Sequence, residues 1–222
     1  MKEKTIWEEN YKEKRRYNTY PYDTVVSFVL KNYSNELKEG VKALDLGFGG
    51  GNHLKFLHDQ GFDYYGIDSS ETAKKIAQGL IGKDAHYSHI VTGDFTNMAF
   101  DNSFFDFVID RQSIGHNDEK TISEILQEVY RVLKKGGRYY GHVFSEEHPS
   151  FRYAQLQEGY DYSDFTDGAF VQSGMVHAFS LDSIMETYHM FKVIEVTKYT
   201  QEKCVNNKIN LSSVIYEISA IK

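Results

Sequence analysis

Short apolar runs alternate with amphipathic stretches along most of this 222-residue chain. The runs at residues 41–46, 63–67 and 104–110 have the length and continuity of buried strands. Residues 118–133 instead repeat apolar side chains at intervals of three and four, as an amphipathic helix does, and Gly136 is expected to stop that helix. Strands that alternate with helices predict an α/β fold with a mostly parallel sheet.

The same pattern predicts the other elements. Residues 22–33, after Pro21, read as a helix, and residues 70–82 read as another that Ser70 caps. Asn52 is expected to cap the helix between the first two strands. Further strands are expected at residues 86–91, 138–144, 191–199 and 213–221.

The turn after the first strand is dense in glycine. Residues 45–51 read DLGFGGG, and glycine is used where the backbone needs positive φ or must approach a ligand closely. The following helix N-terminus adds backbone N–H groups that favour an anionic or polar ligand. Asp68 ends the second strand 23 residues after Asp45, where an acid can accept both hydroxyls of a ribose. The pattern therefore favours a nucleoside cofactor over a bare phosphate.

Four motifs together resemble one known family. The spacing Asp45-x-Gly47-x-Gly49-x-Gly51 resembles the first motif of the class I S-adenosylmethionine (SAM) methyltransferases, of the small-molecule type similar to methyltransferase types 11 and 25. Gly93-Asp94-Phe95, residues 104–110 and residues 132–139 are similar to the next three motifs, in the family's order. The resemblance implies SAM as the cofactor. It also implies a doubly wound sheet of seven strands in the order 3-2-1-4-5-7-6, with the last strand antiparallel, helices on both faces and an N-terminal helical lid.

The resemblance also implies which residues contact SAM. Asp68 and Ser69 would lie at the ribose and Asp94 and Phe95 at the adenine, while Arg16 could pair with the methionyl carboxylate. The N-terminal helix that carries the lid candidates could instead be an ordinary surface helix with a packed tryptophan. The complete expected set is Asp45, Gly47, Phe48, Gly49, Gly51, Asp68, Ser69, Asp94, Phe95, Asp110, Arg111, Tyr11 and Arg16. Trp7 and Tyr17 are further lid candidates.

Two histidines are candidates for a catalytic base. His116 follows the fourth strand and His148 follows the fifth, and imidazole titrates near neutral pH. His116 is the stronger candidate because ligands bind outside the carboxyl ends of the strands. Each histidine could equally be a packing residue. No metal site is expected, because the acids near the fourth and fifth strands match a metal-binding pattern only loosely.

Composition limits the partners. The net charge is −7 and no long Lys/Arg run is present, which argues against nucleic acid as the substrate. No apolar run is long enough for a membrane span, and no signal pattern opens the sequence. One cysteine fits a reducing compartment, so we expect a cytoplasmic protein with no membrane partner. A homodimer is an option that the sequence leaves open.

We expect a single methyltransferase domain with four parts. Residues 1–36 would be the helical lid, residues 37–144 the SAM-binding core, and residues 179–222 a helix and a β-hairpin. Residues 145–178 are rich in Tyr, Phe and Asp, which suggests an insertion that covers the substrate. This segment could instead be a disordered or oligomer-facing loop.

The leading hypothesis is a SAM-dependent methyltransferase that transfers a methyl group to O or N of a small-molecule acceptor. The aromatic insertion suits a compact, partly apolar acceptor. One alternative is a protein or RNA methyltransferase, which predicts an exposed basic or grooved mouth. A second alternative is a SAM- or nucleoside-binding protein without transfer activity, which predicts no reachable space for an acceptor.

Overall fold

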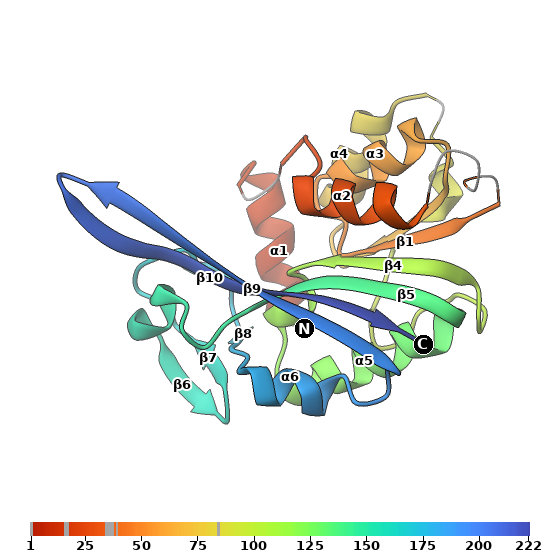
Figure 1. Ribbon diagram of the computed structural model, residues 1–222. Coiled ribbons are helices and arrows are strands. Elements are labelled where there is room, and N and C mark those ends of the chain that lie inside the picture. Colours follow the sequence, from red (N-terminus) through yellow and green to blue (C-terminus); the bar gives the residue numbers. More distant parts are fainter. Residues whose placement is uncertain (1, 16–17, 34–37, 39, 84) are drawn as a thin grey trace.

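The centre of the computed structural model, which describes residues 2–15, 18–33, 38, 40–83 and 85–222, is a seven-stranded sheet (Figure 1). Its strands are β1 (Lys42–Leu46), β2 (Asp63–Asp68), β3 (Ile90–Thr92), β4 (Phe105–Arg111), β5 (Leu133–Phe144), β9 (Val193–Val205) and β10 (Lys208–Ile221). Their order is β3-β2-β1-β4-β5-β10-β9. Strands β1 to β5 are parallel, and β10 is antiparallel to both neighbours. The predicted order is confirmed, with β9 and β10 as its sixth and seventh strands.

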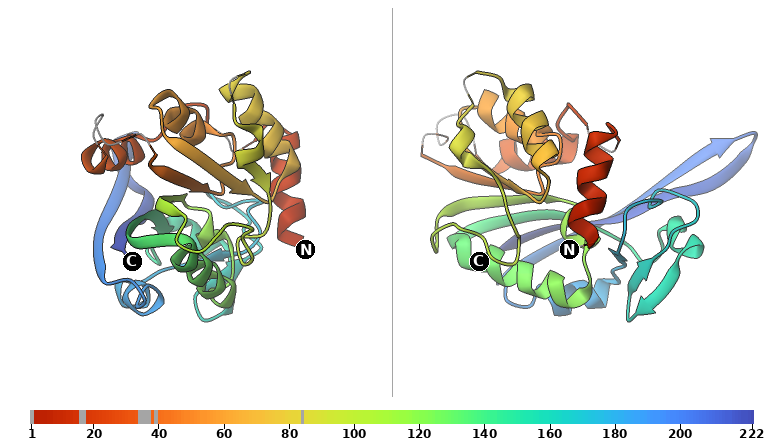
Figure 2. Two further views of the ribbon diagram at one scale, coloured as in Figure 1. Left: turned by 90° about the vertical axis from the view of Figure 1, so that its right-hand side faces the viewer. Right: turned by 180° about the vertical axis from the view of Figure 1, so that it is seen from behind.

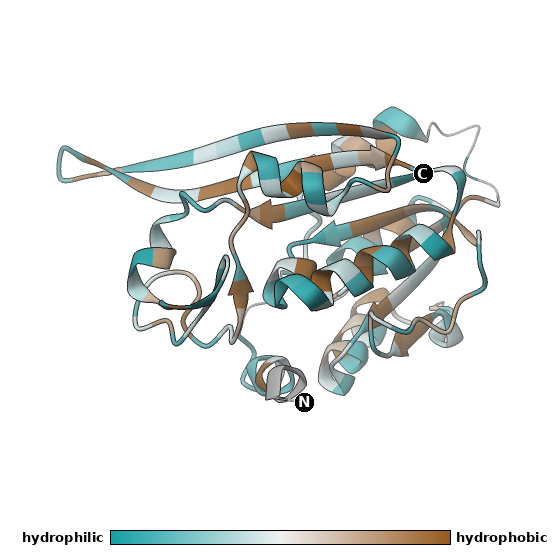
Figure 3. Cartoon of the chain, turned by 90° about the horizontal axis from the view of Figure 1, so that it is seen from below, coloured by the Kyte–Doolittle hydropathy of each residue, from teal (hydrophilic) through white to brown (hydrophobic). Residues whose placement is uncertain are grey.

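Helices cover both faces of this sheet, as expected (Figures 1 and 3). The helices are α1 (Lys2–Lys12), α2 (Asp23–Asn32), α3 (Asn52–Asp59), α4 (Glu71–Ile81), α5 (Glu119–Val132) and α6 (Leu181–Thr187). Helices α2, α3 and α4 pack on one face, and α5 and α6 pack on the other. No helix among the described residues is long and apolar enough to cross a membrane.

Alternation along each strand divides the core between the two faces. Ala43 of β1 packs with the α2–α4 side, whereas Leu44 and Leu46 pack with the α5 side. The apolar stripe of α5 is fully buried there, as its periodicity predicts, and comprises Ile122, Ile125, Leu126, Val129 and Val132. Burying one such side chain stabilises the fold by about 1.5–3 kcal/mol.

Two predicted helix boundaries are wrong. Gly51, at φ 83°, is the N-cap of α3, and the Asn52 side chain instead donates a hydrogen bond to the Tyr20 carbonyl (2.9 Å). Helix α5 ends at Val132, before Gly136, because the chain continues directly into β5. The N–H of Gly136 donates to the Lys222 carbonyl (2.9 Å), so the glycine belongs to this strand end.

The third strand is shorter than predicted. Residues Tyr87–His89 form a 3₁₀ turn, and only Ile90–Thr92 are extended. The backbone N–H of His86 donates to the Tyr64 hydroxyl (3.0 Å), so this N–H is occupied by a side chain instead of a strand partner. Periodicity along the strand does not reveal such a competing partner.

Residues 145–178 contain regular structure and a small core. A 3₁₀ turn, Pro149–Tyr153, precedes three short strands, β6 (Gln155–Glu158), β7 (Asp161–Ser163) and β8 (Val176–His177), which form a separate sheet. The aromatic side chains noted in the sequence pack here, with Phe151, Phe165 and Phe170 buried against Phe144 of β5. The insertion is therefore folded against the carboxyl end of β5.

Strands β9 and β10 continue past the sheet as a two-stranded ribbon (Figure 2). Strand β10 pairs with β5 only over Ile215–Ile221. Beyond that, β9 and β10 pair only with each other, up to a turn at Asn206 and Asn207, both with positive φ. Asparagine tolerates this conformation, which the two-residue turns of hairpins require.

Candidate functional site

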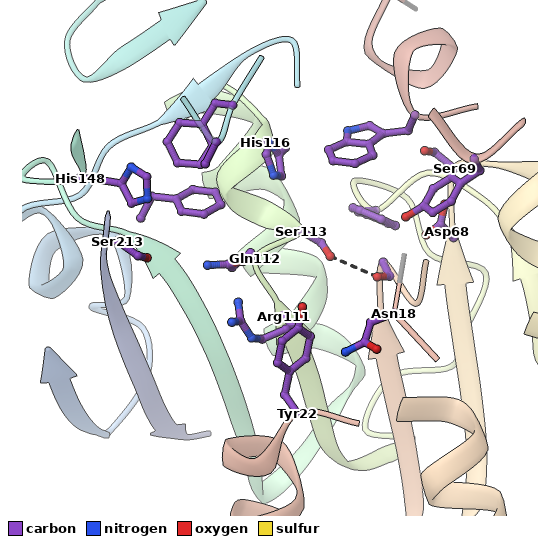
Figure 4. Close-up of a pocket in the computed structure, with 17 residues that line it drawn as sticks. Asn18, Tyr22, Asp68, Ser69, Arg111, Gln112, Ser113, His116, His148 and Ser213 are labelled. Carbon is purple, nitrogen blue, oxygen red and sulfur yellow. Dashed lines mark hydrogen bonds between the residues drawn. The ribbon is translucent and has the colours of Figure 1, made fainter. Parts of the chain in front are cut away.

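A cavity of about 530 Å³ lies at the carboxyl ends of the parallel strands (Figure 4). A second hollow of about 290 Å³ adjoins it, because both are lined by Trp7, Ser69, Phe95, Ser113 and His116. The other residues of the larger cavity are Tyr11, Asn18, Tyr22, Gly47, Asp68, Arg111, Gln112, Phe144, His148, Ala169, Phe170 and Ser213. The structure thus brings most of the expected site residues together.

Two glycines bring the backbone close to neighbouring side chains at the cavity. Gly47 has φ 73°, and a Cβ added there would lie 2.1 Å from the Ser113 Oγ. Gly49 has φ 54°, and its N–H donates to the Asp68 carboxylate (2.9 Å). Only glycine fits this combination of positive φ and close approach. The turn therefore places its backbone close to the cavity, while the N–H groups of Gly47 and Gly49 donate to the Ile67 carbonyl and the Asp68 carboxylate.

Phe48 and Gly51 are two of the expected contacts that do not line the cavity. The Phe48 ring is buried in the core, where a Cβ on Gly66 would lie 2.7 Å from it. Gly51 faces helix α4, and a Cβ there would lie 2.5 Å from the Cβ of Ala77. Both residues therefore support packing around the turn, and their side-chain positions do not reach the cavity.

Asp68 faces the cavity from the end of β2. Its carboxylate accepts hydrogen bonds from the N–H groups of Gly49 and Ser70, both at 2.9 Å. Burial raises the pKa of Asp68 to about 6, although these two hydrogen bonds act in the opposite direction. The carboxylate is fixed in orientation and keeps further lone pairs for a ligand hydroxyl.

Two more acids end the neighbouring strands. Asp45 of β1 is 1% exposed, and neither of its carboxylate oxygens has a hydrogen-bond partner among the described residues. Asp110 of β4 accepts hydrogen bonds from the N–H of Ser113 (2.7 Å) and from the Tyr139 hydroxyl (2.9 Å). Burial raises the pKa of Asp110 to about 7. Asp110 thus holds the loop after β4, and it does not line the cavity.

The smaller hollow contains the expected adenine contacts. Asp94 is exposed at its edge, where its carboxylate accepts hydrogen bonds from the N–H (3.0 Å) and the hydroxyl (2.8 Å) of Thr96. Phe95 lies in the wall shared with the larger cavity. Within the described ranges, no group of three His, Cys, Asp or Glu side chains gathers to hold a metal ion.

Helix α1 covers the glycine turn. Trp7 and Tyr11 line the cavity, and a Cβ on Gly49 would lie 2.8 Å from the Tyr11 hydroxyl. Glu8, on the same helix, accepts hydrogen bonds from the Ser70 hydroxyl (2.6 Å) and the Thr72 hydroxyl (2.7 Å). The hydrogen bond from Ser70 lowers the pKa of Glu8 to about 2. Helix α1 is therefore anchored to the start of α4.

The same helix is joined to the insertion. The Asn10 side chain donates to the Gln172 carbonyl (3.0 Å), and the Arg15 guanidinium donates to the Gln172 side-chain oxygen. The two covers of the cavity are thus bonded to each other. The expected lid residues Arg16 and Tyr17 lie outside the described residues.

The two candidate bases differ in environment. His116 lies in a 3₁₀ turn, Ile114–His116, with its ring centroid 4.8 Å from that of Trp7 and 5.3 Å from that of Phe144. His148 is 5% exposed and stacks on Phe170, and its Nδ1 accepts from the Ser150 N–H (3.2 Å). Burial lowers the pKa of His148 to about 4. His148 is therefore neutral with its proton on Nε2, which suits a hydrogen-bond donor better than a base.

Arg111 reaches the cavity from the end of β4. Its guanidinium carbon lies 4.3 Å from the centroid of the Tyr22 ring. Its Nε and Nη1 are buried without a hydrogen-bond partner among the described residues, and burial lowers its pKa. Asn18, Tyr22, Phe144 and Ser213 are cavity residues that the sequence analysis missed. They belong to no motif, and only the folded chain brings them to the site.

Comparison with known proteins agrees with the methyltransferase resemblance seen in the sequence. Residues 44–141 match a family model described as a methyltransferase domain. An uncharacterized methyltransferase of Geobacillus sp. (strain WCH70) is 30% identical over 122 residues, which are 53% of this chain and 56% of that protein. The chain spans about half the length of the curated relatives it matches.

Solved structures show the same fold. A SAM-dependent methyltransferase from Methanosarcina mazei is 22% identical with a TM-score of 0.67, and the alignment covers 91% of this chain and 98% of that one. A protein from Pyrococcus horikoshii OT3 is 21% identical with a TM-score of 0.62, over 95% of this chain and 98% of that one. At these identities the likeness concerns the fold.

Proposed function

We propose that this chain, which belongs to the class I SAM-dependent methyltransferases, transfers a methyl group to an oxygen or nitrogen atom of a small molecule. One observation carries the proposal. The glycine cradle and Asp68 open into a cavity with aromatic walls, which α1 and the insertion cover together. A covered, aromatic cavity suits a compact acceptor better than a protein or RNA chain.

The residues present fit SAM as the cofactor. Asp68 has lone pairs for the ribose hydroxyls, and at Gly47 and Gly49 the backbone approaches Ser113 and Tyr11 so closely that an added Cβ would lie 2.1 Å and 2.8 Å from their hydroxyl oxygens. Phe95 offers a ring face in the smaller hollow, where the adenine would lie. The two carboxylate oxygens of Asp45 have no hydrogen-bond partner among the described residues, and the His53 Nδ1 lies 3.7 Å from one of them.

When bound, SAM supplies an electrophilic methyl group on a sulfonium. The chain's own residues then orient the acceptor and keep water out. Such positioning can lower the activation barrier by about 7–11 kcal/mol. The Trp7 and Phe144 rings hold the His116 imidazole in place, and one of its ring nitrogens can take the proton that the acceptor loses. The Nε2–H of His148 can donate a hydrogen bond to the acceptor.

Thermal unfolding with SAM, S-adenosylhomocysteine (SAH) or NAD tests the proposal first. A ligand at 100 times its Kd stabilises a protein by about 2.7 kcal/mol, which shifts Tm by roughly 5–11 °C at this size. SAM and SAH should shift the midpoint and NAD should not. Candidate acceptors can then be screened by mass spectrometry for a gain of one methyl group, and a shift with NAD alone would refute the proposal.

A further inference from the structure

We propose that the acceptor carries a carboxylate group, which Arg111 binds inside the cavity. This inference rests on the proposed methyl transfer and names the class of its acceptor. It follows from the charges that face the cavity, from the surroundings of Arg111 and from the donors beside it.

The charges facing the cavity are divided between two sides. Among the described residues that line it, Asp68 is the one acid and Arg111 is the one lysine or arginine. Asp68 lies with Ser69 on the side of the ribose cradle, whereas Arg111 lies away from them, toward Gln112 (Figure 4). The acidic side suits a cationic cofactor, which leaves the cationic side for a second ligand of negative charge.

Arg111 is a half-buried cation, and two of its guanidinium nitrogens lack a hydrogen-bond partner. Its Nε and Nη1 are buried, and it forms no hydrogen bond or ion pair with a described residue. Asp110 and Asp23 act on it only through longer-range attraction. Buried polar atoms without a partner are costly, so a ligand carboxylate at this guanidinium would gain a strong bidentate interaction. The guanidinium carbon lies 4.3 Å from the centroid of the Tyr22 ring, a cation–π contact that uses none of its N–H groups as hydrogen-bond donors.

Hydrogen-bond donors accompany the arginine. Gln112 follows it in the left-handed region, at φ 69°, and its amide faces the cavity. The side chains of Ser213 and His148 also line the cavity. Aromatic rings of Phe144 and Phe170 form the adjoining wall. Donors beside an aromatic wall fit a flat molecule that carries a carboxylate.

The methionyl carboxylate of SAM is the competing partner for Arg111, and the sequence resemblance lists this arginine with the cofactor contacts. Binding measurements distinguish an acceptor carboxylate at Arg111 from the methionyl carboxylate of the cofactor. Isothermal titration of the SAH-saturated protein would use benzoate, salicylate and phenylacetate, each beside its neutral amide. We expect at least one carboxylate to bind ten or more times more tightly than its amide.

Variants complete the test. Arg111→Met should weaken the affinity for the carboxylate at least tenfold and change the affinity for SAH less than threefold. Arg111→Lys should lose part of the carboxylate affinity, because an ammonium group cannot form a bidentate pair with a carboxylate. Arg138→Met is the matched control, because Arg138 is a half-buried arginine on β5 outside this cavity.

The inference is overturned if no carboxylate binds better than its amide, or if Arg111→Met weakens SAH and leaves carboxylate binding unchanged. Failure of SAH to bind the unmodified protein would instead refute the proposed methyl transfer, so the two failures are distinguishable.

Discussion

The hydroxyl of Ser70 donates a 2.6 Å hydrogen bond to the carboxylate of Glu8, a residue 62 positions earlier in the chain. The backbone N–H of Thr72 donates to the same carboxylate (3.1 Å). Ser70 is also the N-cap of α4, so a side chain from one helix completes the N-terminus of another. A negative charge is favourable at that end of a helix. The contact fixes α1 above the ribose cradle.

Glu8→Gln should therefore loosen the cover and speed SAH release. Hydrogen bonds to a charged group contribute about 1.5–3 kcal/mol, so we expect dissociation to be roughly ten times faster or more in stopped-flow measurements. Glu9→Gln is the control, because Glu9 is exposed on the same helix. The pKa of Glu8 is lowered to about 2, so its contribution is complete above its ordinary value of 4.5 and is lost only as pH falls toward 2. Equal release rates in the two variants would show that this contact does not hold the cover.

Gly47→Ala should abolish tight SAH binding. The added Cβ would meet the Ser113 Oγ at 2.1 Å, and φ 73° is strained for alanine. Gly61→Ala separates the two causes, because Gly61 has φ 82° and no atom within 4 Å of the added Cβ. This control should lose about 1–2 kcal/mol of stability and keep its SAH affinity. Adding Ser113→Gly to Gly47→Ala removes the two clashing atoms and should restore part of the affinity, measured by titration calorimetry.

Asp68→Ala should weaken SAH at least 100-fold, because the ribose loses a fixed, buried acceptor. Asp63→Ala, at the other end of β2, is the control and should leave SAH binding nearly unchanged. The pKa of Asp68 is raised to about 6, so its ionised form is lost below that pH. SAH affinity should fall about tenfold between pH 7 and pH 5 for the unmodified protein. An Asp68→Ala protein with unchanged affinity would remove Asp68 from the ribose site.

Asp110→Asn should change how stability depends on pH. Burial raises the pKa of Asp110 from 3.8 to about 7, so the folded state holds a proton that the unfolded state releases. This contribution is complete below pH 3.8 and is lost as pH rises through 7. Relative to Asp110→Asn, the free energy of unfolding of the unmodified protein should fall by at most about 4 kcal/mol between pH 4 and pH 8. Urea denaturation would measure this difference, and parallel curves would contradict it.

His116→Ala should lower kcat about 10²–10⁴-fold, with SAH affinity within threefold of the original. The first acceptor that gives turnover would serve for the assay. His148→Ala is the comparison, and it should weaken acceptor binding more than kcat, because the pKa of His148 is lowered to about 4 and its Nδ1 already accepts a hydrogen bond. An unaffected rate for His116→Ala would exclude it as the base.

The sequence predicts the core of this fold because local pattern and tertiary structure agree there. The glycine turn and Asp68 lie on consecutive elements of one βαβ unit, so their spacing along the chain is enough to predict that they lie side by side. The ends of elements were less predictable. His86 finds its partner in Tyr64, which is 22 residues away, and nothing in the local sequence shows that contact.

The acceptor side of the cavity was harder to predict, because its residues also meet only through contacts that are distant in the sequence. Tyr22 comes from the segment before α2, and Ser213 comes from β10. Neither belongs to a motif, and each reaches the cavity only because β10 lies beside β5 and the first residues fold over the strand ends. The cofactor side is therefore encoded locally, and the acceptor side depends on the complete fold.

The ribbon formed by β9 and β10 has a consequence for local stability. Residues 201–210 are exposed, and beyond Val214 each strand pairs only with the other. An isolated two-stranded hairpin is marginal in water. Its amide hydrogens should therefore exchange with solvent through brief local opening, whereas those of Ile215–Ile221, between β5 and β9, should exchange only when the whole domain unfolds. One continuous strand thus joins the least protected backbone of the molecule to some of its most protected backbone.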